Sequence, residues 1–418
     1  KILRNSYSIM LIGMSLPFML NFSDNTFIND YYAKRLVGVV SIPIFSILVL
    51  RHLVSLIYKR YYVKIMPLYL SIFFFILIFT YLFNAFLSGS ILTMNALLDI
   101  YVALLPFLSL LVVKNINEQD FNYIFKVGLS LAFILGIFYK LQFSYLGLLG
   151  TFYIIHLNKG KRGWRLIIFL PLLILSVYNN LIGKSAVIIL IIFLLSYSMI
   201  VSPTVIKKIK TISFYAIAFL ILYFLFWNNI SYYILDTKSW KNFYLLSSRF
   251  DFNKWNFDTS TMQRINEAEY VIEDYKSNNI IKKIFGNGFG ATIDMRHSKD
   301  TAIKNTHNNL KEVRIIHLLF FSILYKYGLI GVSVLYGFLL FITYKCYFII
   351  KNIKNISLSK DVGEGQNIYL FFSIIYFLGM FYDGQFSAGH LLSNHFFWLC
   401  AIIILTTQIQ NKSSYRIL

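Results

Sequence analysis

The feature that most constrains this chain is a series of apolar segments, each long enough to cross the ~30 Å hydrocarbon core of a bilayer. Only 14% of its 418 residues are charged, whereas about one-quarter are charged in an average soluble protein. We therefore expect an all-α integral membrane protein with about twelve transmembrane helices. The predicted spans are residues 8–22, 36–56, 65–87, 91–113, 123–139, 141–157, 166–182, 185–201, 211–227, 315–344, 368–381 and 391–407. Alternatively, the first third of the stretch 315–344 forms a separate short helix, and the span begins after it.

The distribution of basic residues predicts how these spans are oriented. Excess Lys and Arg should mark the cytoplasmic connections of a membrane protein. Clusters at 59–64, 159–165 and 207–210 fall on the side of the N-terminus, whereas the short connections on the other side carry few basic residues. Both termini are therefore predicted to lie on the cytoplasmic side of an inner (plasma) membrane. The net charge of +21 is then explained by topology and anionic headgroups, and we expect no nucleic-acid partner.

One long polar stretch, from about residue 230 to 311, interrupts the apolar series. On the predicted topology it is a periplasmic or extracellular loop. The chain then divides into membrane helices 1–9 (residues 1–229), the catalytic loop (230–314) and membrane helices 10–12 (315–418). A chain that places one large loop outside the membrane usually carries its chemistry there.

Inside the loop, the sequence predicts an amphipathic helix followed by a glycine turn. Ser260-Thr-Met-Gln263 fits a capping box with Ser260 as the N-cap,, and apolar residues recur at helical spacing up to Ser277-Asn278-Asn279,. Acidic residues, including Glu267, are assigned to other faces of this helix. The run Gly286-Asn-Gly288-Phe-Gly290 follows. Its glycines either present backbone amides to an anion or simply turn the chain back toward the membrane.

Three features of this region recur together in one known family. Arg264 opens the predicted helix, Gly286-Asn-Gly288 follows it, and His317 stands eleven residues before Gly328-Leu-Ile-Gly331. In this arrangement the chain resembles the O-antigen ligase and polymerase family of bacterial surface polysaccharide assembly. The resemblance extends over the topology, but recognisable motifs occupy only about a hundred residues of the chain.

Two positions depart from the family pattern. Lys184 stands at a hairpin turn where the family usually has Arg, and His317 is followed by Leu318 where Asn is usual. The dipeptide His307-Asn308 occurs ten residues earlier, so either histidine fits the family's position. The spacing to the glycines favours His317.

The resemblance implies a GT-C-like membrane glycosyltransferase with an external active site. The expected reaction is polymerisation of O-antigen or capsule repeat units, from an undecaprenyl-diphosphate-linked donor to the non-reducing end of another lipid-linked unit. Ligation of the glycan to lipid A core or to protein is the alternative within the family. A polysaccharide flippase, which is a transporter, is the alternative from another class of protein, although a flippase would need no long structured outer loop. Membrane lipids and a chain-length regulator protein are further implied partners.

The chemistry indicates candidate residues for such a site. A departing lipid diphosphate must meet fixed cations, and the candidates are Lys184, Arg249, Arg264 and Arg314. His317 or His307 would be the catalytic base. No Asp-x-Asp pair occurs in the predicted outer loops, so we expect transfer without a metal or other cofactor. Direct displacement by the acceptor hydroxyl would invert the anomeric centre.

Two carboxylates complete the candidate set. Asp99 lies inside a predicted span, where a carboxylate is a functional candidate by default; it either pairs with a cation or holds a sugar hydroxyl. Asp383 in the last outer loop either lines the cavity or is solvated. Simpler roles remain open for the others: Arg264 pairing with Glu267, Lys184 as an ordinary turn residue, and His317 and Arg314 reaching lipid headgroups.

Overall fold

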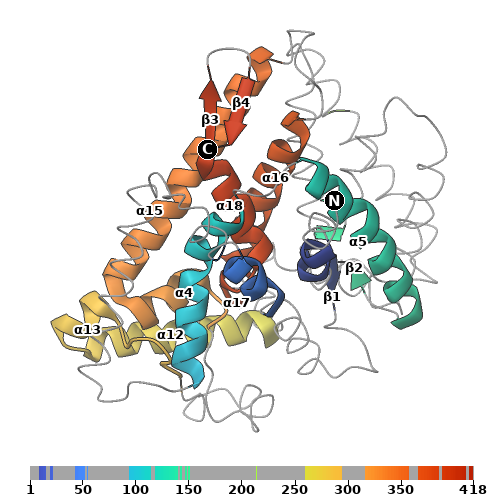
Figure 1. The fold of residues 1–418 in the computed structure, drawn as a ribbon. Helices are drawn as coiled ribbons and strands as arrows, with labels where there is room; N and C mark the ends of the chain where they lie inside the picture. The colour runs from blue at the N-terminus through green and yellow to red at the C-terminus, as the bar shows by residue number, and fades with distance from the viewer. Residues whose placement is uncertain are drawn as a thin grey trace.

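The computed structural model is mainly helical. It describes residues 9–15, 19–21, 43–51, 54, 94–113, 118–139, 142–143, 146–147, 149–150, 213, 259–293, 316–356, 366–385, 388–410 and 414–417. The helices with full bounds are α4 (Met94–Val113), α5 (Glu118–Tyr139), α12 (Thr259–Ser277), α13 (Ile280–Phe285), α15 (Leu319–Ile356), α16 (Gln366–Gly384), α17 (Ala388–Leu392) and α18 (His395–Thr406). Figure 1 shows α12 and α13 near one end of α15 and the β3–β4 pair near its other end.

Two short antiparallel pairs of strands accompany these helices. Strand β1 (Leu20–Asn21) pairs with β2 (Gln142–Phe143), and β3 (Thr407–Gln410) pairs with β4 (Ser414–Ile417). Strands β1 and β2 lie inside the predicted spans 8–22 and 141–157, so the prediction of continuous helices there is wrong. Side-chain hydrophobicity, which defined those spans, does not distinguish a short apolar strand from the end of a helix.

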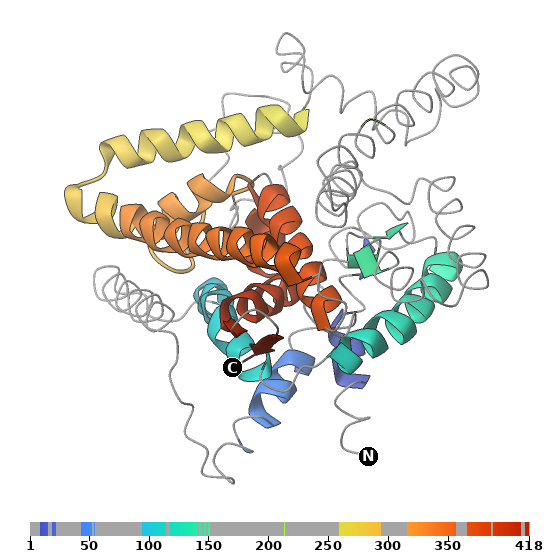
Figure 2. The ribbon, with the colours of Figure 1, turned by 90° about the horizontal axis from the view of Figure 1, so that it is seen from above.

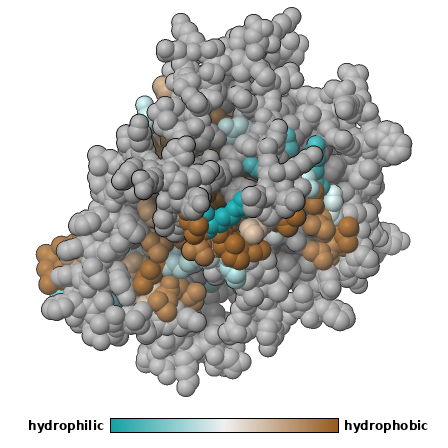
Figure 3. All heavy atoms as spheres, in the orientation of Figure 1, coloured by the Kyte–Doolittle hydropathy of each residue, from teal (hydrophilic) through white to brown (hydrophobic). Residues whose placement is uncertain are grey.

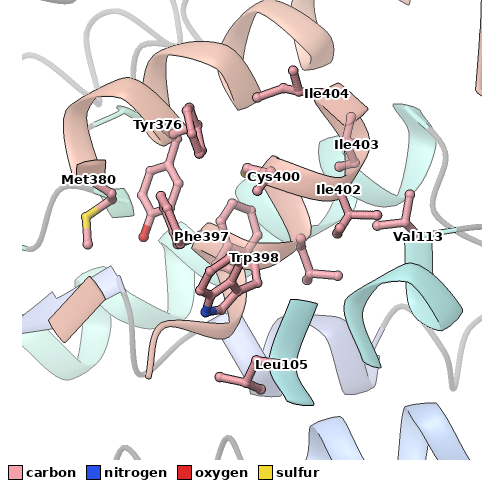
Figure 4. Packing of buried hydrophobic residues seen from close by; sticks show 14 of the residues in the cluster. Leu105, Val113, Tyr376, Met380, Phe397, Trp398, Cys400, Ile402, Ile403 and Ile404 are labelled. Carbon is pink, nitrogen blue, oxygen red and sulfur yellow. The ribbon is translucent and has the colours of Figure 1, made fainter. Parts of the chain in front are cut away.

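Helix α18 forms the centre of the core. All of its residues from His395 to Thr406 are buried, which is the behaviour of a helix that is hydrophobic on every face. It contacts α4, α15 and α16, and Figure 4 shows its side chains packed among those of α4 and α16. The Phe397 ring stacks on Phe377 of α16 with centroids 5.2 Å apart, and the Trp398 indole donates to the Leu392 carbonyl at 2.9 Å.

Two of the described helices have the length and apolar composition of membrane spans, namely the segments Ala96–Val113 and Leu319–Ile350. The apolar stretches Tyr369–Gly384 and His395–Thr406 are shorter. Five predicted spans coincide with helices α4, α5, α15, α16 and α18. Spans 65–87, 166–182 and 185–201 lie outside the described residues, so the number of about twelve stays a prediction.

The outer face of the second half of α15 is apolar. Its exposed side chains recur at helical spacing and are Leu340, Phe341, Tyr344, Tyr347 and Phe348. An apolar stripe of this length suits contact with lipid.

Helix α15 is broken near its start. Gly328 has φ 63° and ψ −162°, which separates residues 319–327 from the remainder of the helix. The alternative of a distinct first segment in 315–344 is confirmed in this respect. The break exists because glycine alone adopts such a backbone conformation readily.

The loop helix was predicted closely from its sequence. Helix α12 ends at Ser277 as expected but begins at Thr259, so the assignment of Ser260 as the N-cap is wrong by at least one residue. Helix α13 begins after Asn279, whose side chain accepts a hydrogen bond from the Lys282 amide at 2.9 Å. Cap signals of this kind predict helix ends because they act over only three or four residues.

The break at Gly328 generates a stability prediction. A Cβ at this position would overlap the main chain of Ile284 and approach the amide nitrogen of Gly286. We expect Gly328→Ala to lower the free energy of unfolding by about 2–4 kcal/mol, from backbone strain and overpacking. Thermal unfolding of the purified protein in detergent is the measurement.

Gly337→Ala in the same helix is the matched control. A Cβ there meets no atom within 4 Å, so this change should be neutral or stabilise by about 0.5–1 kcal/mol. Equal stability of the two variants would contradict the proposed role of the close approach.

Candidate functional site

His317 lies in a turn that the end of α16 holds in place. The His317 carbonyl accepts a hydrogen bond from the Ala388 amide at 2.7 Å, and the Leu319 amide donates to the Gln385 carbonyl at 3.1 Å. The turn before α15 is thus bonded to the connection between α16 and α17. A turn fixed by main-chain bonds on both sides gives the His317 side chain a defined position.

The imidazole of His317 is bound to a buried carboxylate on α12. Glu267 Oε1 lies 2.9 Å from His317 Nδ1, and Glu267 Oε2 accepts from the His317 main-chain amide at 2.8 Å. The Glu267 side chain is fully buried, whereas that of His317 is 39% exposed. An ionised carboxylate can only accept, so Nδ1 is the donor in this arrangement, and the neutral form of the ring would have its lone pair on Nε2.

This pair corrects the sequence interpretation of Glu267. The helical pattern assigned that residue to a polar face, yet its carboxylate is buried and binds His317. The available signal was weak: Glu267 stands one helical turn after Arg264, on the same side of α12. Nothing local to α12 indicates that a histidine fifty residues later would cover that face.

The glycine turn packs against the break in α15. The Asn287 amide donates to the Tyr325 carbonyl and the Gly288 amide to the Lys326 carbonyl, each at 2.8 Å. A helix end leaves main-chain carbonyls without helical donors, and the glycine turn provides donors for two of them just before the break.

Two further amides of the turn also have protein partners. The Gly286 amide donates to the Lys282 carbonyl at 2.7 Å and the Gly290 amide to Asp99 Oδ2 at 2.8 Å. Of the two sequence interpretations, these bonds favour a turn that packs against the helix over a set of amides that cradles an anion.

Asp99 and Lys326 form an ion pair inside the apolar core. Lys326 Nζ lies 2.7 Å from Asp99 Oδ2, and each side chain is only 5% exposed. The prediction that Asp99 pairs with a cation is confirmed. Its partner was missed, although a lysine within an apolar run was itself a signal. Because Asp99 also accepts from Gly290, it links α4, α15 and the glycine turn.

Asp274 fastens the end of α12 to the same turn. Its Oδ2 accepts from the side-chain amides of Asn278 at 2.7 Å and Asn287 at 2.9 Å. A small separate core lies beneath these bonds and consists of Val271, Ile293, Ile316, Leu324 and Tyr325. Figure 2 shows α12 running alongside the first part of α15, with α13 joining them at one end.

The predicted site residues fall into three groups. His317 and the helix that carries Arg264 come together, with Arg264 half-buried one turn before Glu267. Asp383 is half-buried in the last turn of α16, close in sequence to Gln385, which binds Leu319. The positions of Lys184, Arg249, His307 and Arg314 lie outside the described residues.

Comparison with known proteins adds no assignment. No protein-family model matches the chain, and no curated protein matches it in sequence. Within the part of the chain that the structure describes, no group of three or more His, Cys, Asp or Glu side chains is placed to hold a metal ion. The class of protein must therefore be argued from the geometry of the site.

The Asp99–Lys326 pair generates a second prediction. Removing one partner leaves a buried charge uncompensated, so Asp99→Asn or Lys326→Met should each cost about 3–5 kcal/mol of stability. The double variant removes both charges and should lose clearly less than the sum of the two single changes. Unfolding midpoints of the four proteins in one detergent give this coupling.

The exposed lysine on α5 provides the control for this cycle. Lys126→Met removes a charge at the surface and should change stability by no more than about 0.5 kcal/mol. Strict additivity of the Asp99 and Lys326 changes would mean that the two side chains do not interact in the folded protein.

Proposed function

We propose that this chain is a membrane glycosyltransferase of the O-antigen ligase and polymerase type, and that it polymerises lipid-linked oligosaccharide repeat units. One observation carries the proposal. The segments that suggested this family are linked in the fold: Glu267 of α12 binds His317, Asp274 of α12 binds Asn287 of the glycine turn, and that turn packs against Gly328. Contacts among the segments that carry the family motif are expected in an active site, and the packing of apolar helices alone does not require them.

In the proposed reaction, His317 is the general base. A hydroxyl at the non-reducing end of the acceptor attacks the anomeric carbon of the donor, and Nε2 of His317 takes its proton. The bond from that carbon to the diphosphate oxygen breaks, and the undecaprenyl diphosphate leaves with the electron pair. Direct displacement inverts the anomeric centre. Because Nδ1 faces Glu267, Nε2 is the nitrogen that remains for this task.

Glu267 is a positioning residue in this scheme. Its carboxylate holds both the ring and the main-chain amide of His317, so the base keeps one tautomer and one orientation. When His317 takes a proton, the buried negative charge offsets the new positive charge, as in other carboxylate–histidine pairs. Of the two side chains, only that of His317 is exposed, so substrate would approach the pair from the His317 side.

Cations are needed for the leaving diphosphate. Arg264 stands one turn before Glu267 on α12 and is our first candidate, because its guanidinium engages phosphate oxygens in pairs. Lys184, Arg249 and Arg314 are proposed to complete this group. Asp99 is proposed to hold the glycine turn in place without touching the substrate, because its carboxylate binds Lys326 and the Gly290 amide.

The proposed setting is a GT-C-like bundle of about twelve spans, with the α12–α13 loop on the outer face of a bacterial plasma membrane. Two apolar helices of spanning length and the exposed apolar stripe of α15 support it. Ligation to lipid A core or protein differs only in the acceptor. A flippase is less well supported, because the membrane carboxylate it would rely on, Asp99, is paired with Lys326 in the core.

The test is a transfer assay with purified protein and lipid-diphosphate-linked repeat units. A ladder of products without added lipid A core supports polymerisation. A single transfer that requires core supports ligation. Movement of the lipid-linked unit across vesicles without bond formation would contradict a transferase altogether.

Variants of the Glu267–His317 pair give a third prediction. His317→Ala should lower the rate of transfer by about 10²–10⁴-fold, the usual contribution of a general base. Glu267→Gln keeps an acceptor for the His317 amide but loses the charge, so it should reduce the maximal rate more than the apparent affinity for acceptor. Initial rates at varied acceptor concentration separate the two effects.

Glu273→Gln is the matched control, since Glu273 is exposed on the same helix and should keep the wild-type rate. Full activity in His317→Ala, together with its loss in His307→Ala, would transfer the role of base to His307.

A further inference from the structure

Helix α13 presents adjacent large apolar side chains to the outside of the protein. Ile280 is 72% exposed and Ile281 is 41% exposed, and no residue of this six-residue helix is buried. Figure 3 shows the corresponding hydrophobic patch at the edge of the molecule, over the position of α13 in Figure 1. A single exposed isoleucine is ordinary, but two in succession on one short projecting helix are a candidate contact surface.

The position of α13 indicates what that surface meets. Helix α13 packs against α15, and the main chain of Ile284 touches Gly328. Gly328 lies inside the apolar stretch Leu319–Ile350. Helix α13, which carries the exposed isoleucines, therefore lies beside a segment that is itself long and apolar enough to cross a bilayer.

The charged side chains of α13 and of the residues just before it are all positive. Lys276 at the end of α12 is exposed, Lys282 is exposed, and Lys283 lies with its Nζ 5.8 Å from the centre of the Tyr275 ring. Residues 276–285 contain these lysines and no acidic residue. Exposed isoleucines flanked by lysines are the composition of a helix that rests in a membrane interface, where apolar side chains enter the acyl region and ammonium groups reach phosphates.

We infer that α13 is an interfacial membrane anchor, with Ile280 and Ile281 in the outer leaflet and Lys276 and Lys282 at the phosphates of anionic lipids. This inference rests on the proposed membrane span in α15. Because the glycine turn connects α13 to the break in α15, the anchor fixes the height of α12 above the bilayer. Glu267 and His317 are thereby held near the level of lipid headgroups, where a prenyl diphosphate lies.

The experiment measures contact with lipid at single positions of the full chain. Ile280→Cys is labelled with an environment-sensitive fluorophore, and the protein is reconstituted into vesicles of phosphatidylcholine with phosphatidylglycerol. The native Cys346 and Cys400 are both buried, and the unsubstituted protein gives their background labelling. Quenching by lipids that carry a nitroxide on the acyl chain then reports immersion.

Two further positions calibrate the result. Leu340→Cys lies on the exposed apolar stripe of α15 and should be strongly quenched, whereas Glu273→Cys lies on the exposed face of α12 and should be quenched little. We expect Ile280→Cys to resemble Leu340→Cys, with at least about twofold more quenching than Glu273→Cys.

The outcomes separate the anchor from the membrane proposal. Strong quenching at Leu340 with none at Ile280 overturns the anchor and leaves the span intact. No quenching at Leu340 overturns the membrane span and the anchor together. Lys276→Glu with Lys282→Glu should reduce quenching at Ile280, and so should removing phosphatidylglycerol. If neither change has an effect, the role assigned to the lysines is wrong.

Discussion

The candidate site depends on one main-chain contact, the close approach of the glycine turn to the broken first turns of α15. No side chain fits between Gly286 and Gly328, because a Cβ on either would overlap the main chain of the other segment. The amides of Asn287 and Gly288 bind the carbonyls of Tyr325 and Lys326 there. The break in a long apolar helix is thus satisfied by hydrogen bonds from the polar loop, which is what low-dielectric surroundings require.

This contact also explains how charged groups are tolerated beside apolar helices. The turn brings the Gly290 amide to Asp99, whose carboxylate neutralises Lys326. On the other side of the first segment of α15, Glu267 is buried and bound by the His317 ring and amide. Each carboxylate thus has a cationic or hydrogen-bonding partner from a different element: Asp99 joins α4 to α15 and to the glycine turn, and Glu267 joins α12 to the His317 turn,.

The sequence predicted the local features of this region and missed its pairs. Helix α12 and the turn after it follow from apolar spacing and glycines, which act within a few residues, and a separate first segment of 315–344 was one of the alternatives. The partners of Glu267 and Asp99 lie 50 and 227 residues away along the chain. No helical periodicity predicts such contacts, since burial of a polar face depends on which other element covers it.

Sequence alone predicted a series of apolar helices joined by short connections, and it determined that one polar stretch contains an amphipathic helix and a glycine turn. Tertiary structure alone decided that Glu267 is buried against His317, that Lys326 neutralises Asp99, and that residues 20–21 and 142–143 pair as strands. The physical reason is the range of the forces involved. Hydrophobic periodicity and capping are local, whereas the burial of a charge is favourable only after the whole fold has brought its partner within hydrogen-bond distance.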